Sequence, residues 1–337
     1  MPSRQFVLRR IPMLIVLSVI LVLTALIIVG LRRVPRQAVF FGASFSPAYA
    51  RYLGLDARAA FKRVIGEWGF TYVRLPVDWD DLEPLPGQVR WDEIDWYMDE
   101  AGKAGVKVVL VIGQKTPRWP ECHLPSWLDS VPQSEHPARL AGYMRAVVER
   151  YRTHPALDFW QVENEPFLAF GKCPPTTVNQ LHTEIEAVQQ LDSQHLVLVS
   201  DSGELSLWRK TARAADLFGT TVYRTVWNKR LGYFKYDWLP AAWYRLRLAM
   251  HGREAQTAYV MELQAEPWIP NSPIAEVPLK EQYRSFNLAR FDQNVAYARA
   301  IGFPRAYLWG AEWWFWLEQN YGLVDFGAKA AQLPKGK

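Results

Sequence analysis

Eight short apolar runs, separated by longer segments with a helical pattern, constrain the fold of this 337-residue chain more than any other feature. The runs are six to eight residues long, the usual length of buried strands. The expected strands are 38–44, 71–76, 106–113, 157–164, 195–201, 217–223, 258–263 and 306–313. The expected helices between them are 56–69, 91–105, 136–151, 176–192, 207–216, 239–252 and 285–302.

This alternation predicts one (β/α)₈ barrel, because eight strands and seven helices over about 300 residues match the count of that fold. The alternative is a doubly wound open sheet, which usually has a glycine-rich phosphate turn after its first strand. The segment FGASFSPAY (41–49) lacks that turn. Little chain follows the eighth strand, so we expect at most a short last helix.

The segment 11–31 is different, since it contains 21 residues without a charge and is flanked by three arginines on each side. At about 1.5 Å per residue, such a helix would cross a hydrocarbon core of about 30 Å. A cleaved signal peptide is the competing interpretation, but its apolar part would be shorter and would end at a small-x-small site. We therefore expect a single-pass anchor at 11–31, preceded by 1–10, followed by a basic linker at 32–37 and by one domain at 38–337. Because each side of the segment has three arginines, the positive-inside rule does not decide which end of the anchor lies in the cytoplasm.

The net charge of +5 comes from this amino-terminal region. Six of the 39 basic residues and none of the 34 acidic residues lie in 1–36, so the rest of the chain has 33 basic and 34 acidic residues, or −1. The basic flanks suit lipid head groups, and no basic stripe is left for a phosphate backbone. We expect a contact with the lipid bilayer, no nucleic-acid partner, and no particular protein partner.

Polar residues at the carboxyl ends of the expected strands outline a candidate active site, since barrels of this kind carry their functional groups there. Two glutamates from different strands, with a cation and a phenol beside them, are the groups that cleave a glycosidic bond. One carboxylate would be held ionised by the cation and the phenol, while the other, partly desolvated, would keep its proton until bond cleavage. The candidate residues are Arg74, Asn164, Glu165, Tyr223, Glu262, Trp309 and Glu312.

These positions resemble those of a known superfamily. The motif WQVENEP (160–166), the glutamate in YVMELQAEPW (259–268) and the arginine that ends the second strand are similar to those of clan A glycoside hydrolases. That superfamily of retaining (β/α)₈ enzymes includes the family-5 cellulases and the family-42 β-galactosidases. The segment WDDLEPLPGQVRWDEID (79–95) is similar to the stretch that follows strand two in the group. The resemblance covers roughly residues 38–325.

The resemblance implies a role for each matching residue. It makes Glu165 the general acid/base and Glu262 the nucleophile. Asn164 would hydrogen-bond the sugar 2-hydroxyl, and Trp309 would form the floor of the subsite for the reacting sugar. The supporting residues for the nucleophile would be Arg74 and Tyr223.

One position departs from the family-5 pattern, which usually has a histidine at the end of strand three. Here the chain reads VIGQKTPRWPE (111–121). We expect Gln114 or Lys115 to take part of that role. The six histidines show no metal-ligand spacing, so neither a metal nor an organic cofactor is expected.

Other acidic residues compete for the catalytic positions. Glu163 shares a strand face with Glu165 under period-two alternation, and is the second candidate or a structural acid. Glu266 competes with Glu262, but it follows the apolar run beside a proline and is expected on a loop. Glu312 either contacts substrate or satisfies a neighbouring backbone group.

The expected strands leave several tryptophans and both cysteines in the loops between elements. An exposed indole face stacks well on a pyranose ring, so we expect about half of the loop tryptophans to line a glycan groove. Cys122 and Cys173 follow strands three and four, and would form a disulfide outside the cytoplasm or remain two thiols inside it. The tryptophans in predicted loops are Trp79, Trp119, Trp127, Trp227, Trp268, Trp313, Trp314 and Trp316.

Taken together, the sequence predicts a membrane-anchored, extracytoplasmic retaining β-glycosidase that acts on a β-linked oligo- or polysaccharide by double displacement. Glycan substrates favour the outside, which would leave the amino terminus in the cytoplasm. Retention requires about 5–5.5 Å between the two catalytic carboxyl groups. Two alternatives use the same residues: a glycan-binding protein without turnover, and a cell-surface transglycosylase.

Overall fold

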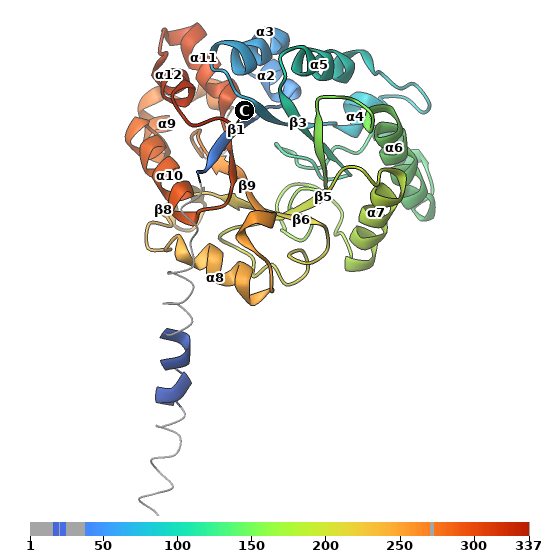
Figure 1. Ribbon diagram of the computed structural model, residues 1–337. Helices are drawn as coiled ribbons and strands as arrows, with labels where there is room; N and C mark the ends of the chain where they lie inside the picture. The colour runs from blue at the N-terminus through green and yellow to red at the C-terminus, as the bar shows by residue number, and fades with distance from the viewer. Residues whose placement is uncertain (1–15, 20, 25–37, 270–272, 337) are drawn as a thin grey trace, which may run out of the picture.

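The structure, a computed structural model, describes residues 16–19, 21–24, 38–269 and 273–336. Its centre is a closed barrel of eight parallel strands, surrounded by helices (Figure 1). The strands are hydrogen-bonded around the barrel in the order β1-β10-β9-β6-β5-β4-β3-β2, which confirms the expected barrel. The bounds are β1 (Phe40–Ser44), β2 (Tyr72–Pro76), β3 (Lys107–Ile112), β4 (Leu157–Val162), β5 (Val197–Asp201), β6 (Leu217–Val222), β9 (Ala258–Gln264) and β10 (Arg305–Trp309).

Helices follow most of the strands, and side chains cap several of them. Asp56 accepts hydrogen bonds from the backbone amides at the start of α3, and Thr177 and Asn287 do so for α7 and α10. A two-stranded hairpin of β7 (Thr225–Asn228) and β8 (Gly232–Lys235) follows β6. The helices are α2 (Pro47–Tyr52), α3 (Ala57–Lys62), α4 (Trp79–Leu82), α5 (Asp92–Lys103), α6 (His136–Tyr151), α7 (Val178–Leu191), α8 (Ala242–Met250), α9 (Leu279–Ser285), α10 (Leu288–Ile301), α11 (Ala311–Tyr321) and α12 (Asp325–Ala331).

The helix expected at 207–216 is wrong, because this segment forms turns in the structure. Trp208 has a φ of 61°, in the left-handed region that interrupts a helix. Its indole is fully buried, donates a hydrogen bond to the carbonyl of Ser202, and lies under the Arg247 guanidinium at 3.4 Å. Tertiary packing of this one ring therefore overrides the helical pattern between β5 and β6.

The eighth strand is shorter than expected, since 306–313 was predicted and β10 ends at Trp309. Gly310, with a φ of 142°, turns the chain directly into α11. A Cβ at this position would lie 2.7 Å from the carbonyl oxygen of Ala265, so only glycine fits. The seven residues after Gly310 are all buried, and apart from Glu312 they are apolar, so this part of the sequence shows neither a strand nor a helix period.

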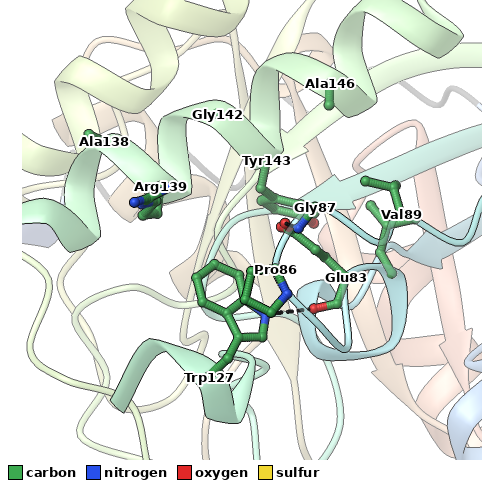
Figure 2. Close-up of a pocket in the computed structure, with 11 residues that line it drawn as sticks. Glu83, Pro86, Gly87, Val89, Trp127, Ala138, Arg139, Gly142, Tyr143 and Ala146 are labelled. Atoms are coloured by element: carbon green, nitrogen blue, oxygen red, sulfur yellow. Dashed lines mark hydrogen bonds between the residues drawn. The ribbon is translucent and has the colours of Figure 1, made fainter. Parts of the chain in front are cut away.

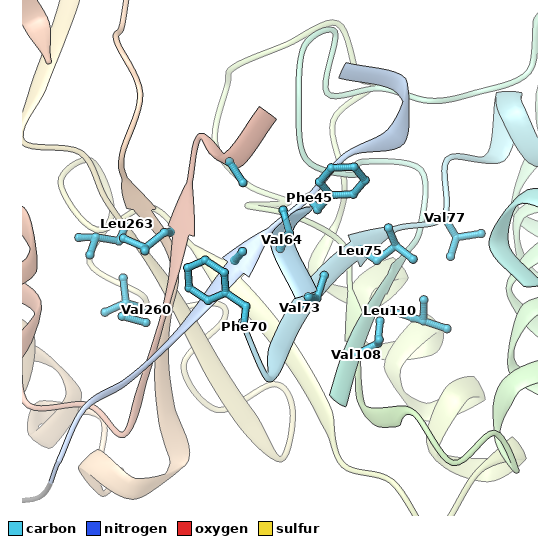
Figure 3. Packing of buried hydrophobic residues seen from close by; sticks show 14 of the residues in the cluster. Phe45, Val64, Phe70, Val73, Leu75, Val77, Val108, Leu110, Val260 and Leu263 are labelled. Atoms are coloured by element: carbon cyan, nitrogen blue, oxygen red, sulfur yellow. The ribbon is translucent and has the colours of Figure 1, made fainter. Parts of the chain in front are cut away.

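Two hydrophobic clusters alternate along the barrel strands. The smaller cluster fills the barrel interior with one side chain from each of six strands: Val109, Phe159, Leu198, Leu217, Met261 and Tyr307. The larger cluster packs the outer face of the barrel against the helices (Figure 3). Its members in the strands include Val73, Leu75, Val108, Leu110, Val260 and Leu263.

A β-bulge interrupts this alternation in β9. Val260 and Leu263 both belong to the outer cluster, although strict alternation would put them on opposite faces. The register shifts at this point against both neighbouring strands, β6 and β10. One extra residue is therefore accommodated, and Glu262 joins Met261 on the interior side.

No helix among the described residues is both long and apolar enough to cross a membrane. The predicted anchor at 11–31 lies largely outside the described residues, of which only 16–19 and 21–24 belong to it. The anchor thus gains no support from the structure and stays a prediction from the sequence.

Candidate active site

One buried guanidinium connects three strands at the carboxyl end of the barrel. Arg74, the central residue of β2 and not its last as expected, is 1% exposed. It donates to Glu262 Oε1 from Nη1, to Asn164 Oδ1 from Nη2 and to Gln161 Oε1 from Nε, each at 2.8 Å. Because all three contacts are short, Arg74 fixes the positions of β2, β4 and β9 relative to one another.

Glu262 has a donor on each carboxylate oxygen. Arg74 occupies Oε1, and the phenol of Tyr223, which follows β6, donates to Oε2 at 2.7 Å. Burial, followed by the charge of Glu262, raises the pKa of Tyr223 well above its ordinary value, so the phenol remains a donor. This carboxylate is therefore oriented from two sides.

The surroundings of Glu165 differ from those of Glu262. Its Oε1 accepts one hydrogen bond, from Thr221 Oγ1 at 2.8 Å. Burial, and then the charges of Glu262 and Glu121, raise the pKa of Glu165 well above its ordinary value, while Thr221 and Lys115 counteract them less strongly. Glu165 thus keeps its proton to a higher pH than an ordinary glutamate, as a general acid must.

The backbone is left-handed at Glu163 and Glu165, with φ of 59° and 47°. Such conformations are costly for residues with a Cβ and cluster at functional sites. The Glu163 carboxylate is fully buried and accepts from the backbone amides of Gln114 and Lys115 at 2.8 Å each. It fixes the turn after β3, so the structure places it as a structural acid.

The side chains of Gln114 and Lys115 form no hydrogen bond with the carboxyl groups of Glu165 and Glu262. Gln114 Nε2 donates to Thr176 Oγ1 at 3.1 Å, ahead of α7. Lys115 Nζ donates to the backbone carbonyls of Glu165 and Leu168. The structure therefore brings neither side chain into the role expected for the strand-three position.

The loop after β3 instead contributes Arg118, which reaches the far side of the barrel mouth. Its guanidinium is ion-paired with Glu266 and with Glu312 Oε2, the latter at 2.8 Å. It lies between the rings of Tyr49 and Trp309, 3.8 and 3.9 Å from their centroids. One face of the predicted subsite floor, Trp309, is therefore covered by this cation.

Glu266 and Glu312 both belong to this ion-pair network. Glu266 follows β9, as expected, but it is buried, and burial raises its pKa to about 7 against the lowering effect of Arg118. Glu312 was expected at the end of a strand, whereas it lies in the first turn of α11 and is fully buried. It accepts from the backbone amide of Ser46 at 2.5 Å, so it satisfies a backbone group, as one of its two expected roles requires.

Sequence reasoning missed one acidic residue of the mouth, Glu121. It is 7% exposed, and its Oε2 lies 3.5 Å from Asn164 Nδ2. Burial, and then the charge of Glu262, raise the pKa of Glu121 to about 8. It stands in a proline-containing loop outside any strand, so no period or strand end marked it.

The eight tryptophans expected in loops differ in how far they are exposed to solvent. Four are buried, namely Trp79, Trp313, Trp314 and Trp316, which are core residues and do not line a groove. Trp119, by contrast, is 63% exposed. It begins a row of touching rings, with centroids 5.3 to 6.0 Å apart, that runs from Trp119 through Phe170 and Trp268 to Tyr223. We call these four residues the aromatic row.

Cys122 and Cys173 are both free and half-buried. They occupy the loops after β3 and β4, as expected, and Cys173 Sγ lies 3.6 Å from the carbonyl oxygen of Glu121. A hydrogen bond between the two thiols lowers the pKa of Cys122 and raises that of Cys173.

A cavity of about 290 Å³ lies away from these residues, between α6 and the loop after α4 (Figure 2). Its acidic residue, Glu83, accepts hydrogen bonds from the Trp79 indole and the Gly87 amide. Trp127 closes one side and donates to the Glu83 carbonyl. With a single, fully engaged carboxylate, this cavity has no acid–base pair.

Comparison with known proteins gives a consistent result. The profile of the cellulase domain (glycosyl hydrolase family 5) matches residues 36–251. A β-galactosidase from Arthrobacter sp. is 28% identical over 148 residues, 38% of this chain and 21% of the relative. A probable mannan endo-1,4-β-mannosidase F from Aspergillus flavus is 37% identical over 65 residues, 18% of this chain and 13% of the relative. The chain thus spans about a fifth or less of the length of these curated relatives.

Among solved structures, a GH5_18 from Bifidobacterium longum subsp. infantis has a TM-score of 0.60 at 14% identity. The match covers 89% of this chain and 80% of the chain in that structure. At that identity the likeness concerns the fold alone. The match of the family profile extends over more than half of the sequence and includes Arg74, Asn164, Glu165 and Tyr223. The chain belongs to glycosyl hydrolase family 5.

Proposed function

We propose that this protein hydrolyses β-glycosidic bonds with retention of configuration. The observation that carries the proposal is the contrast between two buried glutamates at one barrel mouth. Glu262 is held by Arg74 and Tyr223, whereas Glu165 has one neutral hydroxyl donor and a raised pKa. This is the division of roles that a nucleophile and a general acid require.

In the first step, Glu262 attacks the anomeric carbon and forms a bond to it, while the bond from that carbon to the leaving oxygen breaks. The leaving oxygen takes the proton of Glu165. In the second step, the Glu165 carboxylate takes a proton from water, whose oxygen attacks the same carbon and releases Glu262. Arg74 and Tyr223 keep the Glu262 oxygens in place throughout.

The test is hydrolysis of aryl β-glycosides by the wild-type protein. The names of the relatives make the β-galactoside and the β-mannoside the first substrates, with the β-glucoside as a third. We expect release of the aryl group and, by proton NMR of the fresh product, a β-anomer that precedes the α-anomer. An α-anomer first would contradict retention. Binding without turnover on every substrate would favour a glycan-binding protein.

We propose further that the substrate is an oligo- or polysaccharide, because the aromatic row extends from Tyr223 at the catalytic pair to the exposed Trp119. Aromatic faces bind the apolar faces of sugar rings, and a row of them provides contacts beyond the sugar that reacts. A longer substrate would therefore gain binding that a monosaccharide glycoside lacks.

Trp119→Ala is accordingly expected to lower kcat/KM on an oligosaccharide by about tenfold, the effect of losing one stacking contact of ~1.4 kcal/mol. On an aryl monosaccharide glycoside the same variant should keep the wild-type rate. Trp238→Ala, at a tryptophan that is 68% exposed and outside the row, is the matched control. Equal losses on short and long substrates would contradict a binding role for the row.

A further inference from the structure

Glu121 is an acidic residue at the barrel mouth that the proposed mechanism leaves without a task. It comes from the loop after β3. The first two side chains of that loop do not bond the two carboxyl groups, since Gln114 is bonded to Thr176 and Lys115 to the backbone carbonyls of Glu165 and Leu168. Its electrostatic neighbour is Glu262, whose charge raises the pKa of Glu121. The side chain therefore lies within the field of the catalytic pair.

The backbone around Glu121 is fixed by two loops. Its amide donates to the Arg118 carbonyl at 2.6 Å, and the Lys172 amide, from the loop after β4, donates to the Pro120 carbonyl at 3.1 Å. Gly171 has a φ of 83°, and a Cβ there would lie 2.6 Å from the Glu121 Cβ. Only glycine permits this approach, so the loop after β4 packs directly against Glu121.

The carboxyl group itself is much less constrained. It is 7% exposed, and its hydrogen bond to Asn164 Nδ2 is long, at 3.5 Å. Asn164 cannot turn toward it, because its Oδ1 accepts from Arg74 at 2.8 Å and from Ser200 Oγ at 3.0 Å. A fixed amide donor and a carboxyl group with one long hydrogen bond thus face each other at a distance slightly too great for a good bond.

A hydroxyl group placed beside these two atoms can accept from the amide and donate to the carboxyl oxygen at the same time. Burial and Glu262 raise the pKa of Glu121 to about 8, against Lys115, Arg74 and His123, so near neutral pH the carboxyl also retains a proton to donate. A nearly buried carboxyl with one long bond is costly until another partner satisfies it.

We propose that Glu121 and Asn164 bind one hydroxyl of the sugar at the Glu165–Glu262 pair, and that Glu121 is a specificity-determining residue of this site. The inference rests on the proposed function, since it takes the reacting sugar as the ligand. Glu121 would then take part of the role that the resemblance gives to a histidine at the end of strand three, although it lies farther along the loop that follows this strand.

The experiment compares Glu121→Ala with wild type on an aryl β-glycoside and on its 2-deoxy and 3-deoxy analogues. We expect kcat/KM on the parent glycoside to fall by ~10- to 100-fold, as when one buried hydrogen-bonding group loses its partner. On the analogue that lacks the bound hydroxyl, the variant and wild type should differ by less than about threefold, because the contact is already gone.

Two controls separate this effect from a loss of structure. Glu121→Gln keeps a donor and an acceptor and should recover most of the rate on the parent glycoside. Glu184→Ala removes another buried glutamate, on α7, and should change kcat/KM by the same factor on the parent glycoside and on both analogues, so that the wild-type preference for the hydroxyl is kept. Thermal melts of all variants report whether they fold.

Equal loss on all three substrates, or no loss on the parent, would overturn the inference. If wild type hydrolyses none of them, the proposed function has failed, and calorimetric binding of the same three glycosides to wild type and Glu121→Ala decides the inference alone. A preference of wild type for the parent that disappears in the variant would support it, and identical affinities would refute it.

Discussion

Replacing Glu262 by alanine is expected to lower the rate of aryl β-glycoside hydrolysis by at least about a thousandfold, because no other group can form the covalent intermediate. Glu163 and Glu312 are fully buried in other contacts, and Glu266 is paired with Arg118. The measurement is release of the aryl group at saturating substrate, with circular dichroism to show that the variant is folded.

Azide provides a test of which glutamate has which role. In Glu262→Ala the small anion can enter the space of the lost carboxylate and give an α-glycosyl azide. In Glu165→Ala it should attack the intermediate on Glu262 and give the β-glycosyl azide. The same product from both variants, or a Glu262→Ala variant with a tenth of the wild-type rate, would contradict the assignment.

Replacing Arg74 by methionine is expected to reduce the free energy of unfolding by about 3–5 kcal/mol, the usual result of removing one partner of a buried ion pair. The change leaves the Glu262 carboxylate without its cation and removes donors from Asn164 and Gln161. Urea unfolding followed by tryptophan fluorescence measures the effect.

The matched control is Arg139→Met on α6, where the arginine pairs with Glu135 and both side chains are about half exposed. Exposed pairs of this kind contribute about 0–1 kcal/mol. If the two variants unfold at the same urea concentration, Arg74 is not the link between strands that its contacts indicate.

The strands and most of the candidate site residues could be predicted because local sequence determines both. Each strand is a short apolar run, and in a barrel the residues toward its carboxyl end lie at the mouth. Arg74, Asn164, Glu165 and Glu262 were selected by that rule, and the resemblance to clan A glycoside hydrolases supplied their expected roles. The rule succeeded for Glu262 even though the β9 bulge breaks the alternation, since it uses the strand end and not the period.

The remainder depends on contacts between distant parts of the chain. Glu121, Arg118 and Trp119 come from one irregular loop, and their positions are fixed by partners such as Glu266 and Glu312, 148 and 194 residues away in the sequence for Arg118. The start of helix α11 was missed for another reason, since its first seven residues are all buried and, apart from Glu312, apolar, so they show no period.

The extra residue in β9 also lets two consecutive side chains face the interior of the barrel. Deleting Met261 would let the strand alternate regularly, with Val260 and Leu263 still outward and Glu262 still opposite Thr221. The interior cluster would, however, lose one of its six side chains. The bulge therefore allows one strand to supply both a carboxylate at the mouth and an apolar side chain to the layer directly below it, which regular alternation denies to neighbouring residues.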